Sequence, residues 1–292
     1  MSLDDILGGL LKRATVSAST AGSVVSDIAR FVRSSPELLA RNWHLIRYEG
    51  EPLTARVRQL TAHIQELNHD FLTGLPGRRR AFDDFKGKYI SVITDVEACG
   101  EPAYLACLFI DADNFKYAND TYGHAFGDLV LKSIADVLKS NTRKGDDIIY
   151  VTEEKYETVF ARQGGDEFIA IGRIANPKDG RIWAERVHKA MDELQISVPG
   201  NGSYYHQTVS IGVCETAVTQ DNVAVYRKII KEHSIMNRRG GREVILSREG
   251  RELLEDWLLN RYDALRKPAD DAMYRAKQGG RNRIEEHQPS AF

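Results

Sequence analysis

A glycine pair followed at once by two acids, Gly164-Gly165-Asp166-Glu167, constrains this chain more than any other stretch. Apolar, β-prone residues lie on either side of it, at 158–161 and 168–171. Two short apolar runs separated by a glycine pair predict a β-hairpin. Glycine admits backbone angles closed to other residues and lets a ligand approach the main chain. An acid at such a turn suits a divalent cation and a phosphate-bearing ligand, and a solvated hairpin tip is the alternative.

A continuous apolar run of strand length, 104–110, leads into a second acidic segment. Such a run suits a strand that is buried on both faces. It ends at Asp111-Ala112-Asp113-Asn114-Phe115-Lys116, and Asn119-Asp120, Gly123-His124 and Gly127-Asp128 follow. A carboxylate at the end of a buried strand is held by a rigid element and points into a cleft. This segment is therefore typical of a metal site.

The composition excludes several classes of protein. The chain has 292 residues, enough for one large or two modest domains, and is 42% hydrophobic and 28% charged. Its net charge of −2 gives no bias toward nucleic acid or anionic membranes. No apolar stretch approaches the roughly 20 residues that span a bilayer, and no basic leader precedes the first apolar residues. Three cysteines without metal-ligand spacing favour a reducing cytoplasm.

Residues 1–68 are predicted to be helical and separate from the rest of the chain. Apolar residues recur at helical spacing over 3–11, begin again at 28–32, and follow a spacing of three and four over 53–67. This segment is either a small structural bundle or a regulatory or dimerising module.

Helical and strand patterns continue after the acidic motifs. Apolar spacing predicts helices over 120–140, 178–194 and 222–233, and a strand over 204–213. Ser247 is expected to cap a further helix.

The stretch Gly164-Gly165-Asp166-Glu167-Phe168 resembles, letter for letter, the signature of the GGDEF family of diguanylate cyclases. Three further segments are similar to motifs of that family and occur in the same order: 70–79, 111–128 and 269–282. The first of them usually carries Asn where this chain has Gly77, which affects the capping of the helix expected to begin near Arg78.

The resemblance covers about residues 70–284 and implies an α+β fold. The family has a central antiparallel sheet with helices against it, related to the palm of nucleotidyl cyclases and polymerases. The GGDEF domain would span residues 69–292, with insertions near 148–157 and 214–267. The second insertion is either an inert surface segment or a docking or regulatory element.

The implied reaction is the condensation of two GTP molecules into cyclic di-GMP, with release of two pyrophosphates. One domain supplies one half-site, so a homodimer is implied. Asp111, Asp166 and the carbonyl of Ala112 would bind Mg²⁺, or Mn²⁺ in its place, and Glu167 would act with Asp166 as a second catalytic carboxylate. Guanine would be read by two of the substrate-binding residues, Asn119 and Asp128. The other implied substrate contacts are with Asn114, Phe115, Lys116, Gly164, Gly165, Lys277 and Arg281.

Arg143 and Asp146 have the Arg-x-x-Asp spacing of the family's product-inhibition site. The family's usual placement falls instead on Lys155 and Thr158, so a charged turn is the alternative. Besides GTP and a second copy of the chain, a regulatory protein could bind through 1–68 or 214–267. Two other functions stay open: a catalytically silent GGDEF domain that serves as a nucleotide-responsive interaction module, and a cyclase of relaxed base choice.

Overall fold

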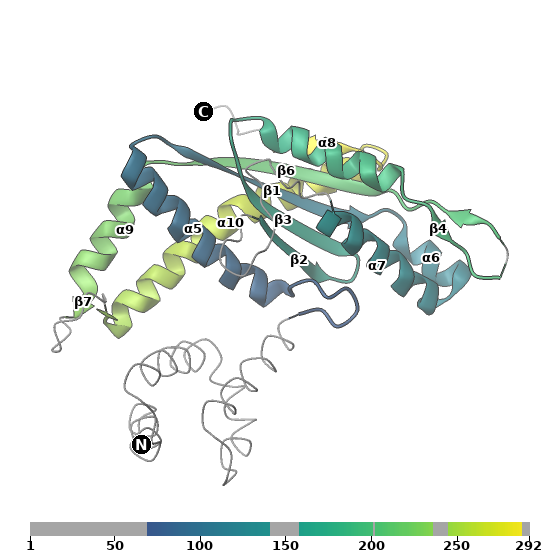
Figure 1. Cartoon of the computed structure of the whole chain (residues 1–292), viewed down its shortest axis with the longest axis horizontal. Helices are drawn as coiled ribbons and strands as arrows, with labels where there is room; N and C mark the ends of the chain where they lie inside the picture. Colours follow the sequence, from purple (N-terminus) through teal and green to yellow (C-terminus); the bar gives the residue numbers. More distant parts are fainter. Residues whose placement is uncertain (1–68, 141–157, 201, 236–244, 288–292) are drawn as a thin grey trace, which may run out of the picture. The chain divides into compact units, whose positions relative to one another are not determined.

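The computed structural model describes residues 69–140, 158–200, 202–235 and 245–287 (Figure 1). The predictions for the N-terminal segment, for the insertion near 148–157 and for Arg143 and Asp146 lie outside these residues. Within the described ranges, no helix combines the length and hydropathy that a bilayer span requires.

A five-stranded sheet forms the middle layer of the domain, in the order β2-β3-β1-β6-β9. Its first four strands pair antiparallel, and the short β9 adds a parallel edge to β6. The strands are β1 (Ala103–Ala112), β2 (Thr158–Gly164), β3 (Glu167–Ile174), β6 (Val209–Val218) and β9 (Ile284–Glu286). The predicted hairpin is formed by β2 and β3, and the predicted α+β fold is confirmed.

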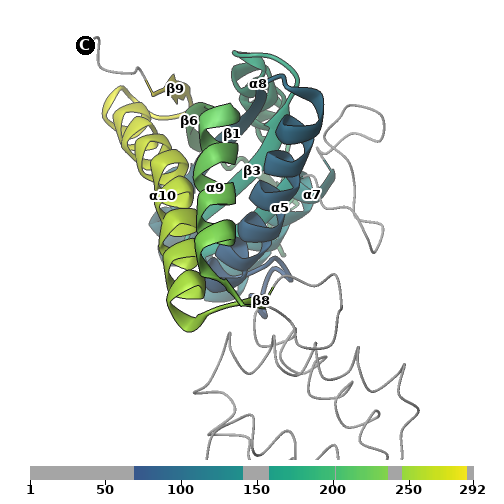
Figure 2. The ribbon, with the colours of Figure 1, turned by 90° about the vertical axis from the view of Figure 1, so that its left-hand side faces the viewer.

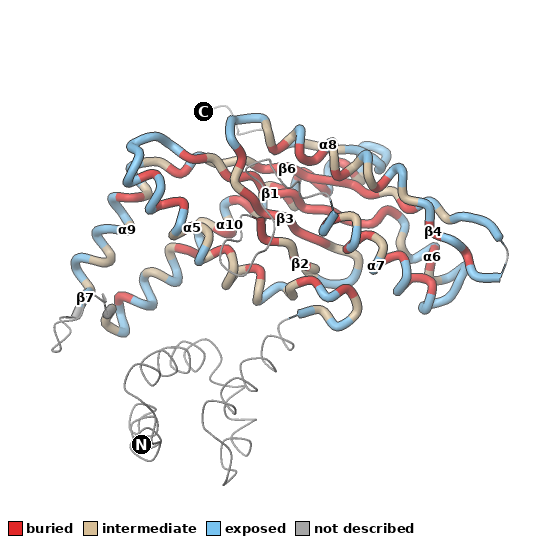
Figure 3. The backbone as a smooth tube through the Cα atoms, in the orientation of Figure 1, coloured by how far each residue is buried: buried red, intermediate tan, exposed pale blue. Residues whose placement is uncertain are grey.

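Helices cover both faces of this sheet because β1 buries alternate side chains on opposite sides. Leu105, Cys107 and Phe109 join one apolar cluster, and the residues between them join the other. The first cluster is completed by α5 (Arg78–Cys99), α9 (Gln220–His233) and α10 (Arg248–Gln278), and the second by α7 (His124–Ser140) and α8 (Asp179–Asp192). Figure 2 shows α10, α9 and α5 next to one another, and Figure 3 shows buried residues concentrated in the central strands.

Two predicted elements are divided in the structure. The helix predicted over 120–140 is instead a short α6 (Phe115–Tyr122) followed by α7. Gly123 separates them, with a φ of +87° that lies outside the helical region and suits glycine. The strand predicted over 204–213 is divided into β5 (Tyr204–Tyr205), which pairs with β4 (Ile196–Ser197), and β6.

The insertion predicted at 214–267 is partly continuous with the elements on either side of it. β6 continues to Val218, and α10 runs without interruption through Pro268. Proline has no N–H, so it leaves the carbonyl of Ala264 without its usual helical donor. The thiol of Cys214 on β6 donates to that oxygen at 3.9 Å. The sheet thus supplies a contact to the carbonyl that Pro268 leaves free.

Short elements join α9 to α10. β7 (Ser234–Ile235) pairs antiparallel with β8 (Ile245–Leu246), and α10 begins directly afterwards. The Oγ of Ser247 accepts a hydrogen bond from the amide of Gly250 at 3.0 Å, so the predicted cap is confirmed. Near the start of the described residues, Gly77 precedes α5 and offers no side-chain cap, as expected from the missing Asn.

Candidate active site

Two neighbouring strands bring the predicted acids to one end of the sheet. β1 and β3 run antiparallel, and Asp111 lies opposite Glu167 in the register. Side chains of directly opposed residues lie on the same face of a sheet. The amide of Ala112 also donates to the carbonyl of Asp166 at 3.3 Å. The structure therefore brings all four predicted catalytic and metal-binding residues together.

Asp111 is the most buried of these acids. Its side chain is 4% exposed, its Oδ2 lies 2.7 Å from Nζ of Lys277, and its Oδ1 has no hydrogen-bond partner among the residues that the structure describes. Burial raises the pKa of Asp111 to about 6, the hydrogen bond from Lys277 opposes this, and the charges of Asp166 and Glu167 add to the rise. The carboxylate thus retains one oxygen that receives no hydrogen bond from the described part of the chain.

The helix α10 brings further charge to this end of the sheet. Burial raises the pKa of Glu167, and the next largest effect is the negative charge of Asp270, two turns before Lys277 on α10. Lys277 and Arg78, the first residue of α5, act in the opposite direction on Glu167. Asp270 and Arg78 were not among the predicted site residues, although both lie in the motifs that carried the resemblance.

The donors at this site fit a divalent cation. A buried carboxylate oxygen without a hydrogen-bond donor, next to a second carboxylate, is stabilised by positive charge. Among the residues that the structure describes, no three His, Cys, Asp or Glu side chains form a metal-binding group by themselves. Mg²⁺ usually takes one or two carboxylates and completes its shell with waters and substrate phosphates. Oxygen donors suit Mn²⁺ as well.

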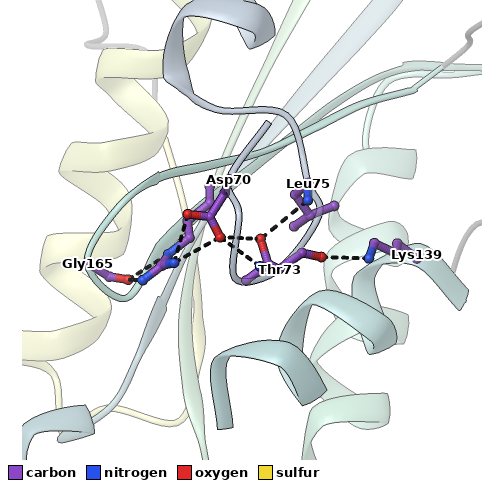
Figure 4. A network of polar contacts seen from close by, with 6 residues as sticks. Asp70, Thr73, Leu75, Lys139 and Gly165 are labelled. Carbon is purple, nitrogen blue, oxygen red and sulfur yellow. Dashed lines mark hydrogen bonds and ion pairs between the residues drawn. The ribbon is translucent and has the colours of Figure 1, made fainter. Parts of the chain in front are cut away.

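A polar network ties the Gly-Gly turn to the segment before α5 (Figure 4). Arg162 on β2 donates through Nε and Nη2 to the carbonyl of Gly165, at 2.9 and 2.6 Å. Its Nη1 donates to both carboxylate oxygens of Asp70, at 2.9 and 3.0 Å. Asp70 also accepts from the amide and hydroxyl of Thr73. The carbonyl of Thr73 accepts from Lys139 of α7, so the network reaches the helix that carries Asp128.

The charge state of Asp70 is set by this network. Its burial alone would raise the pKa, but hydrogen bonds from Thr73 and Arg162 lower the pKa of Asp70 below its usual value. Gly165, whose carbonyl Arg162 binds, has a φ of +52° that favours glycine. The turn geometry therefore depends on one guanidinium held by one carboxylate.

Replacing this guanidinium tests the network. Arg162→Lys keeps the positive charge, but an ammonium cannot reproduce the fork that contacts Gly165 and Asp70 together. We expect a loss of about 1–3 kcal/mol in the free energy of unfolding, measured in urea. The matched control is Arg181→Lys, whose more exposed guanidinium pairs with Glu185 and Glu286 and should change stability by less than about 0.5 kcal/mol. Equal effects of the two substitutions would contradict the role of the network.

The acidic loop after β1 places the predicted base-reading residues on two adjoining helices. Asn119 lies on α6 and Asp128 in the first turns of α7. A Cβ added to Gly127 would lie 1.9 Å from Oδ1 of Asn119, so this glycine lets the Asn119 side chain rest against α7. Asp128 is exposed, as are Lys116 and Asn114 at the start of α6.

Lys277 and Arg281 do not lie on one helical face. They would do so only if the helix continued to Arg281. α10 ends at Gln278, and Arg281 lies in the turn that follows, with a φ of +64°. The structure thus places Lys277 at the acids and Arg281 on the connection to β9.

The chain is similar to known proteins of one family. The family model described as "Diguanylate cyclase, GGDEF domain" matches residues 67–243. Diguanylate cyclase DgcZ of Escherichia coli (strain K12) is 36% identical over 146 residues, which cover 50% of this chain and 42% of DgcZ. Diguanylate cyclase A of Treponema denticola is 31% identical over 180 residues, 62% of this chain and 34% of the relative. The chain thus spans less than half the length of either relative.

A solved structure shows the same fold. The coiled coil and GGDEF domain of DgcB from Caulobacter crescentus, in complex with c-di-GMP, aligns with a TM-score of 0.50 at 22% identity. The alignment covers 80% of this chain and 94% of that chain.

Proposed function

The chain belongs to the GGDEF family of diguanylate cyclases, and from this we propose that it condenses two GTP molecules into cyclic di-GMP and releases two pyrophosphates. The observation that carries the proposal is the buried Asp111, whose Oδ2 contacts Lys277 and whose Oδ1 has no hydrogen-bond partner within the described ranges. A carboxylate oxygen without a protein donor can bind a cation, and an ammonium beside it suits an anionic triphosphate.

The reaction requires attack of a ribose 3′-hydroxyl on the α-phosphorus of a second GTP. A divalent cation held by Asp111, Asp166 and the carbonyl of Ala112 would neutralise phosphate charge and make the hydroxyl more acidic. Glu167 adds negative charge on the same face as Asp111. Lys277 is paired with Asp111 in the structure, and triphosphate oxygens would compete with that carboxylate for its ammonium.

Substrate recognition would be divided between the hairpin, the segment of α6 and α7 that follows β1, and the end of α10. Asn119, which rests against Gly127, and Asp128, the residue after that glycine, would bind the guanine edge. Gly164 and Gly165 carry no side chain, so the triphosphate could lie close to the turn. The phosphates would be held by a shared set of cations and main-chain amides: Lys116, Lys277, Arg281, Asn114 and Phe115.

The proposed product contains two nucleotides, whereas each chain contributes one such set of residues. Two copies of the chain would therefore face each other during the reaction, each with one bound GTP. The proposed assembly is a homodimer that forms at least during turnover.

The direct test is incubation of the purified chain with GTP and Mg²⁺, followed by identification of the products by mass. Cyclic di-GMP and pyrophosphate in a ratio of one to two are expected. Binding of GTP without any turnover, at high protein concentration and with Mg²⁺ or Mn²⁺, would overturn the cyclase proposal and favour a silent nucleotide-responsive module.

Asp128→Ser tests how the base is chosen. Guanine presents two donors, N1–H and the N2 amino group, and an ionised carboxylate can accept from both. Adenine lacks this pair and would leave the carboxylate desolvated without donors, at a cost on the order of 1–3 kcal/mol. With equal GTP and ATP, the unaltered chain should therefore make mainly cyclic di-GMP. Asp128→Ser should raise the share of the mixed guanine–adenine dinucleotide about tenfold, as mass spectrometry would show.

Asp136→Ser is the matched control for this experiment. Asp136 lies two turns further along α7 and its side chain is 76% exposed, so the product ratio should not change. A mixed dinucleotide as the main product of the unaltered chain would contradict the role of Asp128 and favour a cyclase of relaxed base choice.

A further inference from the structure

We propose that Asp113 is a positioning residue for triphosphate binding, and that it acts by holding the turn that carries Arg281. The inference rests on the proposed function, in which Arg281 binds substrate phosphates. Asp113 follows β1 and was not among the predicted site residues, although it stands two positions after Asp111 in the same motif.

Every side-chain oxygen of Asp113 is engaged by protein donors. The side chain is buried, with 4% of the residue's surface exposed. Its Oδ1 accepts from the hydroxyl of Ser210 at 2.6 Å, and its Oδ2 accepts from the hydroxyl of Thr208 and the amide of Asn282, each at 2.9 Å. Its carbonyl accepts from Nε2 of Gln207 at 2.7 Å. One aspartate thus joins the start of β6 to the turn after α10.

The turn that Asp113 holds has an unfavourable backbone. Arg281 and Asn282 have φ values of +64° and +45°, in the left-handed region, which is unfavourable for arginine and is entered more readily by asparagine. Such conformations persist where surrounding contacts over-determine them. Here the amide of Arg281 donates to the carbonyl of Ala276 at 3.0 Å, and the amide of Asn282 donates to Asp113. The turn is therefore fixed to α10 on one side and to Asp113 on the other.

The two aspartates of the motif consequently have different roles. The Oδ1 of Asp111 has no donor among the described residues and is free for a metal ion, whereas each carboxylate oxygen of Asp113 already accepts from at least one donor. A cation at Asp113 would therefore compete with the donors from Ser210 or from the turn. The contacts of Asp113 instead place Arg281, and a small displacement of a binding group can cost a large factor in function.

The decisive substitutions are Asp113→Ala and Asp113→Asn. Alanine removes every acceptor, so the turn should relax and Arg281 should lose its position. Asparagine can place its amide oxygen toward Asn282 and Thr208 and donate its NH₂ to Ser210, whose hydroxyl can also accept. A positioning role therefore tolerates asparagine, whereas a metal-binding role does not.

The measurement is calorimetric titration with a non-hydrolysable α,β-methylene GTP analogue and Mg²⁺, and separately with guanosine. Asp113→Ala should weaken binding of the analogue about tenfold, as the loss of an orienting contact behind a ligand typically does, and leave guanosine binding unchanged. Asp113→Asn should stay within about threefold of the unaltered chain. Ser210→Ala is the matched control, because it removes a hydrogen bond from the same carboxylate without contacting the turn, and it should leave analogue binding unchanged.

A double-mutant cycle shows whether Asp113 acts through Arg281. Arg281→Ala should weaken analogue binding in the unaltered chain and have no further effect in the Asp113→Ala chain. Additive losses, or an equal loss of guanosine binding, would overturn the inference in favour of a purely structural role.

If Asp113→Ala does not fold, a tenfold loss of analogue binding with Asp113→Asn would still overturn the inference. If the unaltered chain binds no analogue, the proposed function fails as well; if it binds normally and Asp113→Ala matches it, only the role of Asp113 fails.

Discussion

Asp166→Ala is expected to lower GTP turnover by at least about two orders of magnitude while the domain stays folded. Asp166 is half-buried at the Gly-Gly turn, and alanine removes its carboxylate without removing volume from the core. The contact between β1 and the turn should persist, because the amide of Ala112 donates to the backbone carbonyl of Asp166 and not to its side chain. The loss should therefore come from the missing cation ligand.

The test compares turnover over a wide range of Mg²⁺ concentration with unfolding in urea. Asp136→Ala is the matched control, since it removes a carboxylate of the same kind from an exposed position on α7. The control should keep full turnover, and both variants should unfold close to the unaltered chain. Substantial activity of Asp166→Ala at saturating Mg²⁺ would remove Asp166 from the proposed cation site.

The parts of the domain that could be predicted from sequence are those determined by neighbouring residues. The hairpin follows from two apolar runs around a glycine pair, and the buried strand follows from the unbroken run before Asp111. Once both strands are placed in one antiparallel sheet, the register brings Asp111 and Glu167 together. The proximity of the predicted acids thus follows from local sequence patterns and one strand pairing.

The parts that were missed depend on contacts between distant positions. Asp70 and Arg162 are separated by 92 residues, and Asp113 and Asn282 by 169. No periodicity of apolar residues predicts such a pairing, because each partner is a polar residue and is absent from the apolar pattern. Asp270 was missed for a related reason: its position on α10 is evident from sequence, but its proximity to Glu167 depends on how α10 lies on the sheet.

Breaks in helices were also hard to predict, for opposite reasons at two positions. Gly123 ends α6 although the apolar pattern continues into α7, because its positive φ interrupts the helix. Pro268 does not end α10, although proline disfavours a helix interior. The thiol of Cys214 contacts the carbonyl that Pro268 leaves free, and the packing of α10 against β6 outweighs the local preference.

Gly212→Ala should destabilise the domain by about 3 kcal/mol or more, because it would force α10 away from β6. A Cβ at this position would lie 1.9 Å from the carbonyl oxygen of Ala269 and 2.2 Å from the amide nitrogen of Met273, both in the backbone of α10. Backbone atoms within a helix cannot move aside independently, so the whole helix must shift. The glycine is therefore required by close packing and not by its backbone angles.

Gly87→Ala is the control, because it should change the free energy of unfolding in the opposite direction to Gly212→Ala. Gly87 is exposed within α5, and no heavy atom of the other described residues lies within 4 Å of an added Cβ. Alanine is the better helix former, so this substitution should raise the free energy of unfolding by about 0.5–1 kcal/mol. Urea unfolding of the two variants side by side measures both effects, and equal stability of Gly212→Ala and the unaltered chain would contradict the packing argument.

Gly212→Ala should also reduce GTP turnover in the fraction of molecules that remains folded. α10 carries Lys277, whose ammonium lies 2.7 Å from Asp111, and it carries Asp270 beside Glu167. A displacement of about 1 Å in a positioned group can lower a rate by a factor of about 100. Turnover per folded molecule, measured well below the unfolding midpoint, should therefore fall together with stability. Full turnover in that folded fraction would show that Lys277 reaches the substrate independently of how α10 packs on β6.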